Sequence, residues 1–146
     1  KDSKIVNNNG DIIFVTNTNT IIELENNEII NNDKSGNFLN IAAAKWGTSG
    51  SNGGAVTLNA KNQKISGNIV VDNISTLDLS LKNGSSYSGT INGDNTAKTI
   101  NISLDSSSCI TLTGDSYITS LENADSTNSN INFNGYTLYV NGVAIN

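Results

Sequence analysis

Arginine and histidine are both absent from this 146-residue chain, and all eight of its basic residues are lysine. Proteins that bind nucleic acid need a basic surface, usually one that contains arginine, whereas this chain has a net charge of −5. Histidine is also the commonest general base and a frequent metal ligand. The composition therefore argues against a nucleic-acid partner and against chemistry that depends on histidine.

Methionine and proline are missing as well. Because the chain begins at Lys1, we interpret residues 1–146 as one domain that forms the C-terminal part of a longer protein. No apolar run approaches the roughly 18–20 residues needed to cross a bilayer, so we expect no membrane insertion. The lack of proline suits a chain whose backbone lies mainly in hydrogen-bonded strands.

Cysteine occurs once, at Cys109, which excludes an intrachain disulfide. The residue lies between Ser108 and Ile110, with no cation close in sequence to lower its pKa. We expect Cys109 to be buried and unreactive, as a small hydrophobic residue in a strand.

Short runs in which apolar and polar residues alternate are what the sequence does contain. Each run has one apolar face and one polar face, which is the pattern of a half-buried β-strand. No amphipathic helical pattern accompanies them. The clearest runs are Thr20–Leu24, Ala55–Ala60, Leu77–Leu81, Thr99–Leu104 and Tyr136–Val140.

The runs repeat with a period near 22 residues. Ile65–Ile69 recurs 22 residues later as Tyr87–Ile91, and the apolar pair Val56/Leu58 recurs, at steps of 23, as Leu79/Leu81 and Ile102/Leu104. Such a period is too short for a βαβ unit, which needs about 30 residues, but it fits one coil of a solenoid. The repeat predicts an all-β, right-handed parallel β-helix, with an antiparallel β-sandwich as the alternative.

In that β-helix, glycines mark the corners of the coils and the repeated apolar positions form one core. Two polar stretches, residues 42–54 and 123–130, interrupt the period and are expected to be loops. The predicted core residues are Val56, Leu58, Ile65, Ile69, Leu79, Leu81, Ile91, Ile102, Leu104, Ile110 and Leu112.

Three segments carry a resemblance to a known family: Trp46–Gly54, Leu112–Leu121 and Asn134–Gly142. They resemble the C-terminal part of bacterial extracellular carbohydrate-binding-domain proteins, which are adhesin-like right-handed β-helices shaped like polysaccharide lyases. This resemblance implies secretion, display on the cell surface and binding of a polysaccharide, either cellulose-like or an acidic plant-type glycan. It also implies calcium in some members, but it transfers no individual binding residue.

Aromatic side chains are scarce and are the first candidates for stacking on sugar rings. Trp46 lies in a Gly/Ser-rich stretch, where it is either an exposed sugar platform or a plug that fixes the loop to the wall. Tyr136 and Tyr139 lie on opposite faces of the last strand, and we take Tyr139 as the second carbohydrate-binding candidate. Tyr87 replaces Ile65 in the repeat and is expected in the core.

Asp72 and Asp94 are 22 residues apart, so the repeat predicts that they lie on adjacent coils. Two such carboxylates repel each other unless one is protonated or a cation lies between them, and oxygen ligands suit Ca²⁺. The pair is therefore a candidate calcium site, with two solvated turn residues as the alternative. No cofactor is otherwise required.

These observations favour a non-catalytic polysaccharide-binding β-helix that is extracellular or on the cell surface. A structural stalk of an adhesin and a polysaccharide lyase or hydrolase remain the alternatives. The lyase alternative would need a lysine base, because arginine is absent, and a hydrolase would need gathered carboxylates.

Overall fold

The computed structural model describes residues 1–146 and contains short strands and no helix, so the protein has no helix that is long and apolar enough to cross a membrane. The chain winds through about six coils, each with up to three strands. In chain order the strands are β1 (Lys4–Asn7), β2 (Ile13–Val15), β3 (Thr18–Glu25), β4 (Glu28–Asn31), β5 (Leu39–Ile41), β6 (Gly54–Lys61), β7 (Lys64–Ser66), β8 (Ile69–Val71), β9 (Thr76–Lys82), β10 (Ser86–Gly89), β11 (Thr99–Leu104), β12 (Cys109–Leu112), β13 (Ser116–Ile118), β14 (Ser120–Asn123), β15 (Ile131–Asn132), β16 (Leu138–Val140) and β17 (Val143–Ala144).

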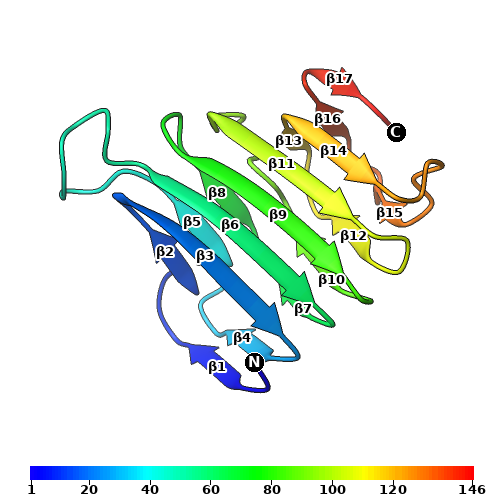
Figure 1. The fold of residues 1–146 in the computed structure, drawn as a ribbon, viewed down its shortest axis with the longest axis horizontal. Helices are drawn as coiled ribbons and strands as arrows, with labels where there is room; N and C mark the ends of the chain where they lie inside the picture. The colour runs from blue at the N-terminus through cyan, green and yellow to red at the C-terminus, as the bar shows by residue number, and fades with distance from the viewer.

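Strands of successive coils stack into three walls. The long wall is the five-stranded sheet β14-β11-β9-β6-β3, whose strands lie side by side in the foreground of Figure 1. The second wall contains the pair β1-β4 and the sheet β15-β12-β10-β7, and the third wall contains β2-β5-β8 and β13-β16-β17. Every pairing is parallel except the antiparallel pair β16–β17 at the C-terminal end. The predicted parallel β-helix is confirmed, and the antiparallel sandwich is excluded.

The pairing between coils follows the predicted repeat, with one error. Tyr87 pairs with Ile65 at a spacing of 22, and Ile102 pairs with Leu79 at a spacing of 23. However, Leu79 pairs with Leu58 and not with Val56, so our first step of 23 was wrong by two residues. A turn that is shorter by two residues shifts the strand register by two, and this keeps every side chain on the same face of the sheet. The pattern of apolar residues therefore could not distinguish the two registers.

The insertion predicted at residues 42–54 is present as a loop between β5 and β6. Ile22 pairs with Leu58 across it, a spacing of 36 residues. Figure 1 shows this loop projecting from the coils next to the start of β6.

One continuous core lies between the walls. All eleven predicted core residues are buried and belong to one cluster of 24 buried residues. Tyr87 is 1% exposed, and its hydroxyl donates to the carbonyl of Gly67 at 2.9 Å. A Cβ at Gly89 would lie 2.4 Å from that hydroxyl, so glycine is needed there to make room for the tyrosine.

Asparagine, more often than glycine, turns the chain at the corners. Ten residues other than glycine have positive φ, and nine of them are asparagine, including Asn26, Asn62 and Asn83 between the long and second walls. Asparagine tolerates this left-handed conformation better than other residues with a Cβ, because its short polar side chain can bond locally. Our assignment of the corners to glycine was therefore incomplete.

A column of polar side chains lies inside the corner where the long wall meets the second wall. We call it the buried polar column, and it contains the residue immediately before the second-wall strand in four successive coils: Asn27, Gln63, Ser85 and Ser108. The backbone N–H of Asn27 donates to Gln63 Oε1 at 2.8 Å, and that of Gln63 donates to Ser85 Oγ at 3.1 Å. The backbone N–H of Ser85 continues the column by donating to Ser108 Oγ at 3.2 Å. These bonds satisfy backbone groups that the turn would otherwise leave unpaired.

Candidate functional site

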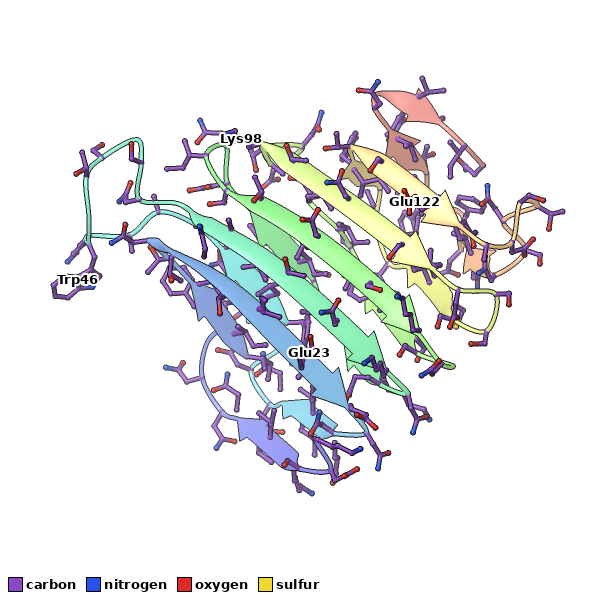
Figure 2. The ribbon with its side chains drawn as sticks, viewed as in Figure 1. Glu23, Trp46, Lys98 and Glu122 are labelled. Carbon is purple, nitrogen blue, oxygen red and sulfur yellow. The ribbon has the colours of Figure 1, made fainter.

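The outward face of the long wall carries two rows of polar side chains, because alternate residues of a strand point to the same face. Strand pairing places one residue of each strand in each row. The first row is Ile21, Thr57, Asp78, Asn101 and Ser120, all polar except the exposed Ile21, and the second row is Glu23, Asn59, Ser80, Ser103 and Glu122. Figure 2 shows side chains standing along this face, with Glu23 and Glu122 toward its opposite ends.

Hydrogen bonds within the first row run in one direction. Ser120 Oγ donates to Asn101 Oδ1 at 2.7 Å, and Asn101 Nδ2 donates to Asp78 Oδ1 at 2.8 Å. In the second row Asn59 Nδ2 donates to Glu23 Oε1 at 2.6 Å. Both chains of donors therefore end on a carboxylate, which keeps further acceptor capacity toward solvent.

The remaining polar groups of the two rows have no hydrogen-bond partner within the protein. They are the hydroxyls of Thr57, Ser80 and Ser103 and the carboxylate of Glu122. The three hydroxyls are half-buried and the carboxylate is exposed. A ligand on this wall could pair with all four without breaking an existing bond.

The rows line an open groove that crosses the strands. A hollow of about 370 Å³ is bounded by ten residues between Thr57 and Glu122, of which only Leu79 and Ile102 are hydrophobic. A second hollow of about 590 Å³ shares Thr57 and Asp78 with the first and extends it toward Asn19. Together the two hollows extend from β14 to β3, and we call them the long-wall groove.

The charged side chains that line the long-wall groove are acidic. Asp78 lines both hollows and Glu122 lines the first, whereas no lysine lines either. The nearest lysines of the same wall, Lys61 and Lys82, follow the second row at the far ends of their strands. The groove therefore offers hydrogen-bond acceptors and negative charge to a ligand.

The groove holds two carboxylates, Asp78 and Glu122, which lie on different strands and in different rows. They are separated by two coils and two residues along the strand, which corresponds to about 12 Å between their Cα atoms. No group of three or more Cys, Asp or Glu side chains that could hold a metal ion is present.

Trp46 is 74% exposed, so the plug interpretation of this residue is wrong. Asn52 holds the loop instead, since its Nδ2 donates to the carbonyls of Ala44 and Trp46 at 2.8 and 3.0 Å. Gly47 packs directly against Asn17, with no room for a Cβ. The indole lines neither hollow of the groove, and Figure 2 shows it extending from the loop, away from the strands.

Tyr139 lies on the third wall, half-buried and outside the long-wall groove. Its ring stacks on that of Tyr117, with centroids 4.8 Å apart and an interplanar angle of 4°. The antiparallel pairing of β16 with β17 places Tyr139 opposite Ala144. One ring face is therefore occupied by a tyrosine, which leaves Tyr139 less suited to sugar stacking than we expected.

The two aspartates of the candidate calcium site occupy different settings. Asp72 accepts the backbone N–H groups of Ala43 and Ile74, at 2.7 and 3.2 Å. Burial alone would raise the pKa of Asp72, but these bonds and the hydroxyl of Ser75 lower it. In the next coil, the residue that bonds to the backbone of Asp72 is Lys98, whose N–H donates to the Asp72 carbonyl. Asp94 lies in the turn before Lys98, where it is exposed and forms no hydrogen bond. The spacing of 22 thus does not make Asp94 the residue paired with Asp72, and calcium binding stays a prediction.

Cys109 is exposed, which contradicts our prediction that it is buried. Ser108, immediately before β12, and Ile110, within it, are both buried, so the alternation of the extended chain turns Cys109 outward. We relied on the general preference of cysteine for the protein interior. The alternation of inward and outward side chains along the strand already predicted that Cys109 faces solvent.

Sequence reasoning missed the residues of the long-wall groove, although it identified their strands. The detectable signal was the polar position between buried neighbours in each run, such as Asp78 between Leu77 and Leu79. Comparisons with protein-family models, curated proteins and solved structures find no match. The resemblance to extracellular carbohydrate-binding proteins therefore stays a prediction.

Proposed function

We propose that the protein is a non-catalytic polysaccharide-binding β-helix of the cell exterior, and that the long-wall groove is its binding surface. The observation that carries the proposal is the pair of polar rows, in which a hydroxyl, amide or carboxylate occurs at every strand of the second row and at every strand of the first row except that of Ile21. Adjacent coils are about 4.8 Å apart, which is close to the length of one hexose in an extended chain. A repeating ligand laid across the coils would meet at least one hydrogen-bonding group at each step.

The chemistry of the rows supports sugar more than other repeating ligands. Sugar hydroxyls are donors and acceptors at once, so they can pair with the free hydroxyls of Ser80 and Ser103 and with the carboxylates. Each exposed hydrogen bond replaces one to water and contributes little, so single sugars should bind weakly. Polymers should bind better, because one chain engages several coils together.

The length of the groove limits how many sugar residues of a polysaccharide can bind at once. Five strands span four coil spacings, or about 19 Å. Affinity for oligosaccharides should therefore rise with length up to about four or five sugar residues and then level off.

Affinity electrophoresis on cellulose-type, pectate and related polymers tests this function, together with an assay for released reducing or unsaturated ends. The Ser80→Ala/Ser103→Ala variant should weaken retention severalfold. The matched control Ser66→Ala/Ser88→Ala removes two hydroxyls from the same two coils on the second wall, and it should bind as the parent does. Release of chain ends would support a lyase or hydrolase, and the absence of retention on every polymer would favour a structural stalk.

A further inference from the structure

The direction of the hydrogen bonds in the long-wall groove restricts which polysaccharide fits it. Ser120 donates to Asn101, and Asn101 donates to Asp78, so every donor in this chain is directed toward a carboxylate. The second carboxylate oxygen of Asp78, Oδ2, receives no hydrogen bond from the protein. The Asp78 side chain is exposed to solvent. The group that completes Asp78 must therefore be a donor, such as a sugar hydroxyl.

The second row has a carboxylate at each of its ends. Glu23 accepts from Asn59 through Oε1, and Glu122 has no hydrogen-bond partner within the protein. Donors from a ligand would form charge-assisted bonds with these carboxylates, which are stronger than bonds between neutral groups. No lysine lines either hollow of the groove, so a ligand carboxylate beside Asp78 would meet no compensating cation, whereas Lys82 shares an adjoining hollow with Ser103 and Glu122.

From these observations we infer that the long-wall groove selects neutral polysaccharides rich in hydroxyl groups and rejects uronic-acid polymers. The inference rests on the proposed function and decides between the cellulose-like and acidic glycans that the sequence left open. A uronate in the groove would lie within a few ångströms of Asp78, and like charges at that distance repel each other. Salt screens such repulsion between exposed groups, so the selectivity should decrease as ionic strength rises.

The test compares neutral and anionic forms of one polymer backbone by affinity electrophoresis, in low salt with a chelator present. Hydroxyethylcellulose and carboxymethylcellulose form one pair, and methyl-esterified and saponified galacturonan form the other. We expect at least tenfold weaker retention by the anionic member of whichever pair binds. Asp78→Asn should reduce that difference severalfold, because the amide keeps an acceptor oxygen and loses the charge. Asp94→Asn is the matched control, since it removes the same charge from an exposed turn outside the groove.

Each outcome separates the inference from the proposed function. Retention of an anionic polymer that equals or exceeds that of its neutral form would overturn the inference, while the binding function would stand. Equal effects of Asp78→Asn and Asp94→Asn would also overturn it, because the selectivity would then come from net charge alone. If no polymer of either charge is retained, the proposed function fails, and the inference fails with it.

Discussion

The buried polar column and the rows of the long wall are built from the same residue types at the same coil spacing, but they differ in what surrounds them. Gln63 is only 1% exposed, and its side chain makes four hydrogen bonds. Its Oε1 accepts the backbone N–H and the side-chain amide of Asn27, and its Nε2 donates to the carbonyls of Asn27 and Lys64. Ser80 and Ser103 are half-exposed and have no partner. A hydrogen bond contributes most where losing it leaves a group that water cannot reach. The column should therefore determine stability, and the rows should be free to serve a ligand.

Replacing Gln63 by leucine should have the largest effect on stability. The change keeps the side-chain volume but leaves the N–H of Asn27 and its side-chain amide buried without an acceptor. We expect a loss of about 3 kcal/mol in the free energy of unfolding. Urea denaturation measures it, and Asn59→Ala in the second row is the control, which should change stability by less than about 0.5 kcal/mol. Equal losses in the two variants would remove the distinction between column and rows.

Acidification should weaken the corners before it affects the core. The hydroxyl and N–H of Ser35 and the N–H of Gly10 lower the pKa of Asp33 to about 2. Burial would raise the pKa of Asp105, but the N–H of Asn83 and the hydroxyls of Ser108 and Ser107 outweigh it and lower the pKa to about 2. Both carboxylates are harder to protonate in the folded state than at their ordinary value of 3.8. Each therefore stabilises the fold above about pH 4, and this contribution is lost as the pH falls toward 2.

Thermal melts at pH 6, 4, 3 and 2 measure that loss. Asp105→Asn should lower the melting temperature at pH 6 and make the melting temperature less dependent on pH. Asp94→Asn is the control, because Asp94 forms no hydrogen bond, and it should leave the pH profile unchanged. A profile for Asp105→Asn that follows the parent's from pH 6 to pH 2 would contradict the role assigned to this corner.

Ser85→Ala should have an intermediate effect. It removes the acceptor of the Gln63 N–H, and it also removes a hydroxyl that donates to the carbonyl of Lys82 at 2.7 Å. We expect a loss of about 1–2 kcal/mol. Ser80→Ala makes the same chemical change in the second row and should be close to neutral in urea denaturation. A neutral Ser85→Ala would show that the turn rearranges to satisfy Gln63 by another route.

Asn101→Ala should separate binding from stability. Its side chain bridges Asp78 and Ser120 on the exposed face, so the free energy of unfolding should change by no more than about 0.5 kcal/mol. Affinity for a neutral polymer should nevertheless fall about five- to tenfold, because Asp78 is then no longer oriented. Isothermal calorimetry with an oligosaccharide measures the binding. Unchanged affinity would exclude the first row as part of the site.

The smallest expected effect concerns Cys109, which tests whether adjacent side chains of the second wall point to opposite faces. Ser108 belongs to the buried column, and Cys109, the next residue, faces solvent. A thiol reagent should label Cys109 in the folded protein at a rate near that of the unfolded chain. Cys109→Ser should leave stability within about 0.5 kcal/mol of the parent. Protection of the thiol until the protein unfolds would show that this part of the second wall is covered.

The repeat in the sequence was sufficient to predict the parallel β-helix, the loop at residues 42–54 and the inward direction of all eleven named core residues. Burial against neighbouring coils requires apolar residues at alternate positions, and this requirement is visible in one dimension. The same alternation placed Asp78 outward between Leu77 and Leu79, but it carried no information on which residues of other coils lie beside it. The pairing of Leu79 with Leu58, and not with Val56, depended on turn length, which hydrophobic pattern does not record.

The sequence by itself determined that the chain is all-β, that its strands repeat in coils, and which side of each strand is apolar. Only the tertiary structure decided which polar residues meet: Ser120, Asn101 and Asp78 in one chain of donors, and Asn27, Gln63 and Ser85 in another. It also decided that Trp46 is exposed and that Tyr139 stacks on Tyr117. The physical reason is that burial depends on the residue and its immediate neighbours in the strand. A hydrogen bond between coils depends on the exact register of segments about 20 to 36 residues apart.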